Sequence, residues 1–200
     1  MKVVVITGGI GSGKSIACSF LEEEYGWPVY NADSKVKELY VKSGSLVKNI
    51  ETALERSFCD ENGKFVPSLL ASVIFSDRKA LETVESLVFP ELMADFKNWK
   101  SYHNDSDYVI LESATILEKP ALKDVGDVIV VIDAPVDVRV ERASERDSLS
   151  ADVIFSRVKN QPLMNDISSC RGLDVDYVVL NDSTLDNLYI KLREVAEKLL

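Results

Sequence analysis

The sequence has few of the residues on which several common kinds of site depend. Its 200 residues include a single histidine, His103, which excludes a histidine-rich metal site and a histidine-based catalytic triad. The three cysteines, Cys18, Cys59 and Cys170, are scattered and form neither a C-x-x-C pair nor a disulfide framework. We therefore expect reduced thiols and a cytoplasmic location.

Long apolar runs are also missing, since none approaches the roughly 20 residues of a membrane-spanning helix. The first residues lack the charged region and cleavage site of a secretory signal. A formal net charge of −10 argues against DNA or RNA as a partner. We expect neither a membrane nor a nucleic-acid partner. With 46% hydrophobic and 28% charged residues, the chain has the composition of one ordinary globular domain.

A glycine-rich stretch near the start of the sequence carries the strongest signal. Residues 7–15 spell T-G-G-I-G-S-G-K-S, which meets the pattern G-x-x-x-x-G-K-[ST] from Gly8 to Ser15. A β-branched apolar run precedes it, and apolar residues at helical spacing follow it. This order of strand, loop and helix is what a phosphate loop requires. The sequence therefore predicts a nucleoside triphosphate site.

Each part of this motif can contribute to binding a triphosphate together with its Mg²⁺ ion. Glycines let the backbone N–H groups point inward round an anion, and the helix N-terminus favours negative charge. Lys14 can reach the β- and γ-phosphates, and the Ser15 hydroxyl can ligate Mg²⁺. The residues expected to surround the phosphates are Gly9, Ile10, Gly11, Ser12, Gly13, Lys14 and Ser15.

A carboxylate follows the second predicted strand, near residues 28–31. In an open parallel sheet, ligands collect beyond the carboxyl ends of the strands, so we expect Asp33 on the same edge as the phosphate loop. Asp33 can act as a general base, or it can cap the helix that follows. The sequence leaves both roles open, and one carboxylate can serve both.

The region from about 46 to 103 has helical patterns, and it lies between two predicted strands. It is either a substrate-binding insertion or a long helical crossover. Within it, Phe89-Pro90 is expected to break a helix. Further strands are expected near 107–112, 127–133 and 176–181. Glu112 stands at the end of the first of these, where a carboxylate can lie near a metal.

An arginine-rich helix follows the fourth predicted strand. Arg139, Arg142 and Arg146 stand at i, i+3 and i+7, which places them on one helical face. The like-charge pair Arg142 and Arg146 costs a few tenths of a kcal/mol unless an anion is present. We favour a guanidinium clamp on phosphates over a solvated face. Arg157 extends the basic set, and the segment of about 138–171 is predicted to be a lid.

These stretches resemble the dephospho-coenzyme A kinase family in order and spacing over nearly the whole chain. The first resembles the family's N-terminal loop, and the others resemble its motifs D-A-D, P-L-L-F-E, R-x-x-x-R-D and R-x-x-x-Q and its closing strand. The matching segments are residues 7–15, Asn31-Ala32-Asp33, residues 114–118, Arg142 to Asp147, Arg157 with Gln161, and residues 176–181.

The resemblance implies a single α/β domain over residues 1–200 with the three-layer fold of P-loop nucleoside triphosphate hydrolases. This fold has a central parallel sheet, and it would carry the helical insertion and the lid. The implied activity is ATP- and Mg²⁺-dependent phosphorylation of the ribose 3′-hydroxyl of dephospho-coenzyme A, the last step of coenzyme A synthesis. The partners would be these two small molecules, and we expect a monomer or a weak homo-oligomer.

The resemblance also assigns roles to residues. It implies Asp33 as the general base and Mg²⁺ held at Ser15. The residues implied in catalysis are Asp33, Lys14 and Arg142. Those implied in ATP binding beyond the loop are Arg142, Arg146 and Asn181, and those implied in acceptor binding are Asp33 and Arg157.

The chain departs from the family pattern at three places. Phe89-Pro90 stands where the family has His-Pro, Ala114-Thr115 replaces Pro-Leu, and Asn31 replaces the first aspartate of D-A-D. These changes leave the expected phosphate machinery in place. They bear instead on how the two ends of the acceptor are held.

Other functions share part of this pattern. Another small-molecule kinase, acting on a nucleoside monophosphate or a sugar, would have the same loop, insertion and arginines. A GTP-driven switch would need N-K-x-D, which is absent, and D-x-x-G directly after a strand. The segment 60–63 spells D-x-x-G, but no buried strand precedes it. An ATP-binding module without turnover is disfavoured by Asp33 and by the arginine face.

Overall fold

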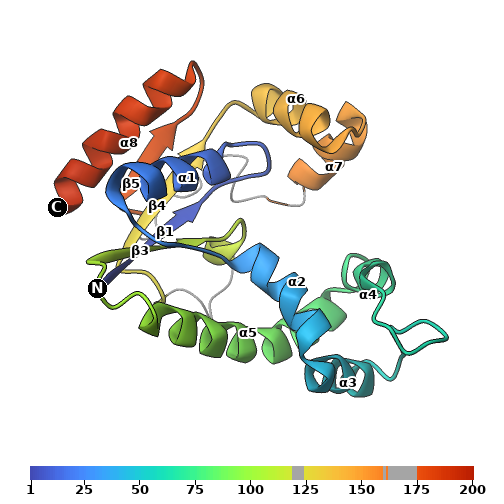
Figure 1. Cartoon of the computed structure of the whole chain (residues 1–200). Coiled ribbons are helices and arrows are strands. Elements are labelled where there is room, and N and C mark those ends of the chain that lie inside the picture. Colours follow the sequence, from blue (N-terminus) through green and yellow to red (C-terminus); the bar gives the residue numbers. More distant parts are fainter. Residues whose placement is uncertain (119–123, 160, 162–174) are drawn as a thin grey trace. The chain divides into compact units, whose positions relative to one another are not determined.

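A computed structural model describes residues 1–118, 124–159, 161 and 175–200 (Figure 1). The described residues fall into two compact units, one made of 1–31 with 103–200 and the other of 32–102. The elements of the first unit are β1 (Lys2–Thr7), α1 (Lys14–Tyr25), β2 (Val29–Asn31), β3 (Tyr108–Glu112), the short 3₁₀ helix η1 (Ile116–Glu118), β4 (Val128–Asp133), α6 (Val136–Asp147), α7 (Ala151–Lys159), β5 (Tyr177–Leu180) and α8 (Leu185–Leu199).

The strands form one parallel sheet in the order β2-β3-β1-β4-β5. β1 lies at the centre, where Val3 pairs with Val109 of β3 and Val5 pairs with Ile129 of β4. Residues 3–6 are all buried, as expected for an apolar run covered on both faces. The expected α/β fold with a central parallel sheet is confirmed, and the carboxyl end of β1 delivers the chain into the phosphate loop.

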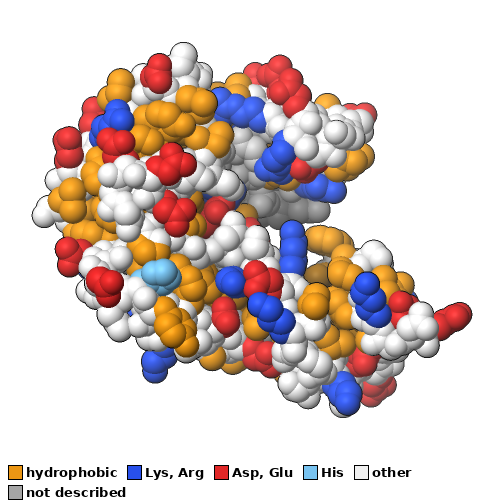
Figure 2. Space-filling model, in the orientation of Figure 1, with side chains coloured by type: hydrophobic (Ala, Val, Ile, Leu, Met, Phe, Trp, Pro, Cys, Tyr) orange, Lys and Arg blue, Asp and Glu red, His pale blue; other side chains and the backbone are white. Residues whose placement is uncertain are grey.

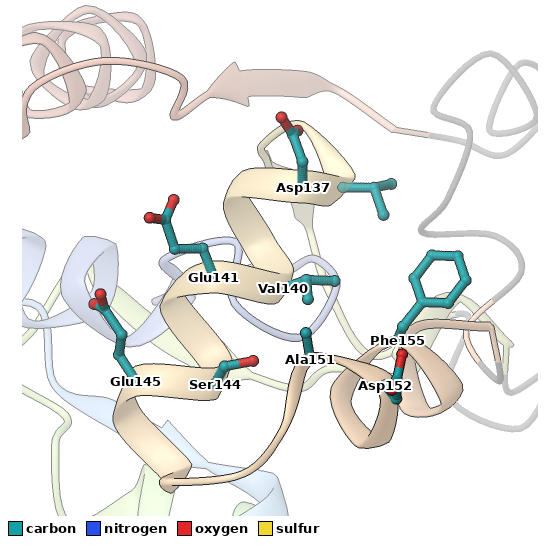
Figure 3. A pocket seen from close by; sticks show the side chains of 9 residues that line it. Asp137, Val140, Glu141, Ser144, Glu145, Ala151, Asp152 and Phe155 are labelled. Atoms are coloured by element: carbon teal, nitrogen blue, oxygen red, sulfur yellow. The ribbon is translucent and has the colours of Figure 1, made fainter.

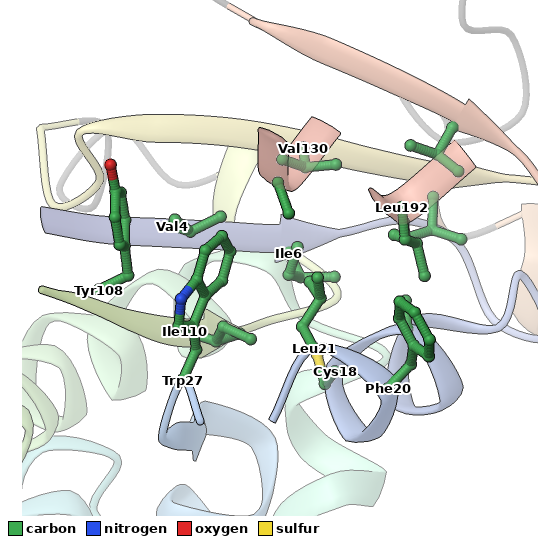
Figure 4. Close-up of a cluster of buried hydrophobic side chains, with 14 of the residues drawn as sticks. Val4, Ile6, Cys18, Phe20, Leu21, Trp27, Tyr108, Ile110, Val130 and Leu192 are labelled. Atoms are coloured by element: carbon green, nitrogen blue, oxygen red, sulfur yellow. The ribbon is translucent and has the colours of Figure 1, made fainter. Parts of the chain in front are cut away.

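One face of the sheet packs against α1 and α8 (Figure 4). α8 begins after Thr184, whose hydroxyl accepts a hydrogen bond from the backbone N–H of Asn187. Its buried residues recur at helical spacing, and α1 contributes a matching apolar side. The cluster also holds Trp27 and Tyr108, whose ring centroids are 4.8 Å apart. This packing fixes the start of α1, where the phosphate loop ends.

The second unit consists of α2 (Ala32–Lys42), α3 (Gly44–Ala53), α4 (Pro67–Ile74) and α5 (Arg78–Ser101) with their connections. The expected helix break at Phe89-Pro90 is wrong, because α5 continues through Pro90. A proline inside a helix removes a hydrogen bond. However, α5 buries apolar residues on one face both before and after Pro90, and this packing keeps the segment helical. The buried residues of α5 are Ala80, Val84, Val88, Leu92 and Phe96.

Charged side chains of both signs are interspersed with apolar ones on the face shown in Figure 2. Within the part of the chain that the structure describes, no helix combines the length and the apolar character needed to cross a membrane.

Candidate active site

The glycines of the phosphate loop adopt conformations that other residues rarely accept. Gly11 has a φ of 75° and Gly13 a φ of 100°, both in the left-handed region. A Cβ on Gly11 would lie 2.1 Å from the carbonyl oxygen of Arg139, and one on Gly13 would lie 2.3 Å from Nδ2 of Asn181. Gly13 precedes the first residue of α1 and supplies no capping side chain. The N–H groups of this helix start can therefore face an anion.

Lys14 places its charge over the loop. Its Nζ donates a hydrogen bond to the carbonyl oxygen of Gly9 at 3.1 Å, although Lys14 itself is the first residue of α1. The ammonium group thus folds back across the loop toward the region that the glycines surround. A compact cation at this position suits the terminal phosphates of a nucleotide.

A hydroxyl, a carboxylate and an amide meet beside the loop. Ser15 Oγ donates to Glu112 Oε1 at 2.8 Å, and Asn31 Nδ2 donates to Glu112 Oε2 at 2.7 Å. Glu112 is only 5% exposed, so these bonds hold its carboxylate in one orientation. Sequence reasoning gave Glu112 only a possible supporting place and assigned Asn31 no role. The hydrogen bond between Asn31 and Glu112 depends on the pairing of β2 with β3, which places these two residues opposite each other.

The donors at this corner fit a hard divalent cation. Mg²⁺ prefers oxygen ligands and usually binds through one or two protein oxygens together with substrate phosphates. Ser15 Oγ and Glu112 supply such oxygens. In the described ranges, no group of three or more His, Cys, Asp or Glu side chains could hold a metal.

Asp33 stands on the first turn of α2, and its side chain is exposed. The helix begins one residue earlier, at Ala32, so Asp33 lies inside it. Of the two roles that the sequence left open for Asp33, the N-cap does not fit, because an N-cap precedes the first helical residue. A carboxylate in the first turn is still favoured by the helix dipole. Asp33 belongs to the unit of residues 32–102.

The expected three-arginine clamp is wrong for Arg139. This side chain is fully buried, and its Nε donates to the carbonyl oxygen of Ile10 at 3.0 Å. Burial lowers the pKa of Arg139, and the nearby carboxylate of Asp133 opposes that shift. Helical spacing placed the arginines on a common face, but the start of that face packs against the loop. Arg139 thus supports the loop from behind.

The other arginines have separate partners. Arg142 Nη1 donates to the carbonyl oxygen of Asn181 at 3.1 Å. Arg146 contacts the Asp147 carboxylate through two hydrogen bonds of 2.8 and 3.1 Å, and Arg157 approaches the same carboxylate at 3.4 Å. The bonds from Arg146 hold the pKa of Asp147 below its usual value. The Asp147 carboxylate therefore partly neutralises the positive charges of Arg146 and Arg157.

Asn181 connects the end of β5 to the loop. Its Nδ2 donates a hydrogen bond to the carbonyl oxygen of Ser12 at 2.8 Å. Its backbone N–H donates to the carbonyl oxygen of Asp133 at 2.6 Å. The residue is 3% exposed. With the bond from Arg142 as well, Asn181 joins α6, β4 and the loop. Sequence reasoning placed Asn181 near the nucleotide and did not predict that it braces the loop.

A groove runs between α6 and α7 (Figure 3). Its lining combines apolar residues such as Val140 and Phe155 with several carboxylates. These carboxylates would repel a triphosphate, so the groove is unsuited to bind the phosphates of a nucleotide. The acidic lining residues are Asp137, Glu141, Glu145 and Asp152.

The parallel sheet and the loop, with Lys14 and the Ser15–Glu112 contact, define an α/β phosphotransferase of the P-loop class. Comparison with known proteins narrows this class, because a family model described as dephospho-CoA kinase matches residues 2–187. The chain belongs to the dephospho-CoA kinase family.

Individual relatives agree with this assignment. A dephospho-CoA kinase of Porphyromonas gingivalis is 37% identical over 181 residues, covering 90% of this chain and 86% of that protein. One from Bacteroides fragilis (strain YCH46) is 34% identical over 178 residues, covering 88% of this chain and 83% of that protein. Both matches extend over most of each chain, so the family resemblance is not confined to the phosphate loop.

Solved structures show the same fold. TT1252 from Thermus thermophilus has a TM-score of 0.82 at 25% identity, covering 100% of this chain and 98% of that one. A dephospho-CoA kinase from Campylobacter jejuni has a TM-score of 0.65 at 18% identity, with 98% and 96% covered. A shikimate kinase from Acinetobacter baumannii has a TM-score of 0.55 at 14% identity, with 100% and 93% covered. The last two similarities concern the fold alone.

Proposed function

We propose that this protein transfers the γ-phosphoryl group of ATP to the ribose 3′-hydroxyl of dephospho-coenzyme A, giving coenzyme A and ADP. The family match over residues 2–187 carries the proposal. The alternative of a nucleoside monophosphate or sugar acceptor has no comparable support, since the shikimate kinase similarity extends to the fold only. The reduced cysteines expected from the sequence favour a cytoplasmic enzyme, which we propose is a monomer or a weak homo-oligomer.

The proposed mechanism depends on positioning and on charge stabilisation. The loop N–H groups and Lys14 hold the phosphates, and Ser15 with Glu112 would hold Mg²⁺. The metal, when bound, neutralises charge on the β- and γ-phosphate oxygens. Asp33 takes the proton of the 3′-hydroxyl while the new oxygen–phosphorus bond forms. The bond from the γ-phosphorus to the bridging oxygen breaks, and ADP leaves with that electron pair.

The helical region of about 46–103 is proposed to bind the acceptor, with Asp33 and Arg157 among its contacts. The segment of about 138–171 is proposed to be a lid that excludes water from the γ-phosphate. Residues 160 and 162–174 of that segment lie outside the described residues. Arg142, Arg146 and Asn181 are proposed to contact ATP.

Replacing Glu112 by glutamine is expected to weaken Mg²⁺ binding. The amide keeps the size of the side chain and a partner for Ser15, but it loses the negative charge beside the metal. We expect the Mg²⁺ concentration for half-maximal activity to rise about 10-fold, the lower end for loss of a supporting group at a metal site. Titrating Mg²⁺ into the ADP complex gives a second readout. Glu23→Gln, on the exposed side of α1, is the matched control. An unchanged Mg²⁺ titration in the Glu112→Gln variant would mean that Glu112 does not contribute to binding the metal.

Arg142→Ala and Arg146→Ala are each expected to lower kcat/KM about 10- to 100-fold, because a guanidinium that contacts phosphate makes a strong, charge-assisted bond. In the Arg146–Asp147 pair the side chains are 61% and 24% exposed, so losing this surface pair should change stability by less than about 1 kcal/mol. Steady-state kinetics and thermal melting separate the two effects. Glu145→Gln on the same helix is the control. Wild-type kcat/KM in both arginine variants would mean that this face is only solvated.

Ligand-induced stabilisation tests the acceptor directly. In the presence of a non-hydrolysable ATP analogue, dephospho-coenzyme A at 100 times its Kd should stabilise the protein by about 2.7 kcal/mol. For a chain of this size, that corresponds to an increase in Tm of roughly 5–10 °C. AMP and shikimate at equal concentrations are the comparison acceptors. A shift with one of these and none with dephospho-coenzyme A would reassign the substrate.

A further inference from the structure

The peptide groups of Ile10, at the tip of the phosphate loop, are both held by residues from outside the loop. The backbone N–H of Ile10 donates to Gln161 Oε1 at 2.8 Å. Its carbonyl oxygen accepts from Arg139 Nε at 3.0 Å. Neither partner belongs to the pattern G-x-x-x-x-G-K-[ST]. The geometry of the loop tip is therefore set by side chains that follow it by more than 120 residues (the separations are 151 and 129).

The side chain of Ile10 also contacts α6 and α7. It packs against the small apolar cluster between α6 and α7, whose buried members are 0–1% exposed. Ile10 therefore contacts these helices through its side chain as well as through its main chain. The other residues of the cluster are Ala143, Ile154 and Val158, with Val136 and Val140 partly buried beside them.

The glycines beside Ile10 permit this close approach. A Cβ on Gly9 would lie 1.8 Å from Arg139 Nη2, and one on Gly11 would lie 2.1 Å from the Arg139 carbonyl oxygen. The two glycines are thus required by α6 as much as by a nucleotide. The loop and the first turns of α6 are packed together with no room for a side chain between them.

Both partners are themselves held in place. The backbone N–H of Gln161 donates to the carbonyl oxygen of Val158 at 3.0 Å, which fixes it just beyond the end of α7. Arg139 is fully buried on α6, and the nearby Asp133 carboxylate attracts its charge. A partner that is itself fixed to α6 or α7 ties the conformation of Ile10 to these helices.

We infer that Gln161 and Arg139 are positioning residues that act through Ile10 to hold the phosphate loop in its binding conformation before the nucleotide arrives. A consequence is that α6 and α7 are anchored to the loop at Ile10. The inference rests on the proposed function only in taking the loop as the phosphate site.

The test uses the full-length protein and the variants Gln161→Leu and Gln161→Glu. Leucine removes the acceptor for the Ile10 N–H, whereas glutamate keeps an oxygen at the same position. Ser156→Ala, on the exposed side of α7, is the control. Hydrogen exchange of the Ile10 amide is measured without ligand. Binding of ADP is measured by titration, and KM is determined for each substrate.

In Gln161→Leu, we expect the Ile10 amide to exchange at least tenfold faster, with the exchange of α8 amides unchanged. The Kd for ADP and the KM for ATP should both rise about tenfold, with little change in the KM of the acceptor. In Gln161→Glu, the slow exchange of Ile10 should remain. A role in stability alone would lower Tm and leave the Kd for ADP unchanged.

Two outcomes in the Gln161→Leu variant would overturn the inference. One is wild-type exchange of Ile10 in Gln161→Leu, and the other is faster exchange with an unchanged Kd for ADP. Fast exchange in Gln161→Glu would also contradict it, because the acceptor atom would then not matter. If the wild-type protein binds no ADP at all, the proposed function fails, whereas the exchange measurement still reports on Ile10.

Discussion

Lys14→Ala is expected to reduce kcat/KM by about 10²–10³-fold while leaving the fold intact, because it removes a preorganised charge from the phosphates. The ammonium group lies over Gly9, and Lys14 is not a member of the apolar cluster that α1 and α8 form against the sheet, so thermal melting should change little. ADP production with ATP and dephospho-coenzyme A measures the activity. Circular dichroism melting measures the stability.

A lysine on the surface of the same unit provides the control for this variant. Lys198→Ala, near the end of α8, removes one positive charge away from the loop and should keep full activity. If soluble, folded Lys14→Ala produced ADP at the wild-type rate, the assignment of the phosphate loop would be wrong.

Asp33→Asn is expected to lower kcat by about 10²–10⁴-fold, the usual contribution of a positioned general base. Asparagine keeps the shape of the side chain but cannot take the proton of the 3′-hydroxyl. Affinity for ATP should remain close to that of the wild type, since Asp33 is proposed to contact the acceptor. The loss of a carboxylate from the first turn of α2 should cost only about 0.3–1 kcal/mol.

Asp186→Asn is a closely matched control for Asp33→Asn. Asp186 is the second residue of α8, as Asp33 is the second residue of α2, and both side chains are exposed. The two variants should therefore lose similar stability through the helix dipole. If Asp33→Asn melted at a lower temperature but kept its kcat, Asp33 would be a structural residue and the base would be another group.

The elements that local patterns determine could be predicted from the sequence. The apolar run 3–6 predicted β1, the glycines predicted the turn into α1, and the run 128–133 predicted β4. Lys14 and Ser15 were predicted because their spacing from the glycines is itself the signal. In each case the information lies within about ten neighbouring residues.

Features that depend on distant contacts could not be predicted in this way. The bond from Asn31 to Glu112 requires β2 to pair with β3, and the sequence does not give the order of the strands. Helical spacing grouped Arg139 with Arg142, but it could not show that Arg139 packs beneath the loop. The same limit explains Pro90, where burial along one face of α5 outweighs a local helix-breaking preference.

The position of the transferred phosphate tests the proposed activity most directly. The purified protein is incubated with ATP, Mg²⁺ and dephospho-coenzyme A, and the product is examined by phosphorus NMR and mass spectrometry. We predict one new phosphate monoester on the ribose 3′-oxygen for each ADP formed, and formation of this product about 10²–10³-fold more slowly with the Lys14→Ala variant. Phosphorylation of AMP or shikimate with no reaction of dephospho-coenzyme A would contradict the proposal.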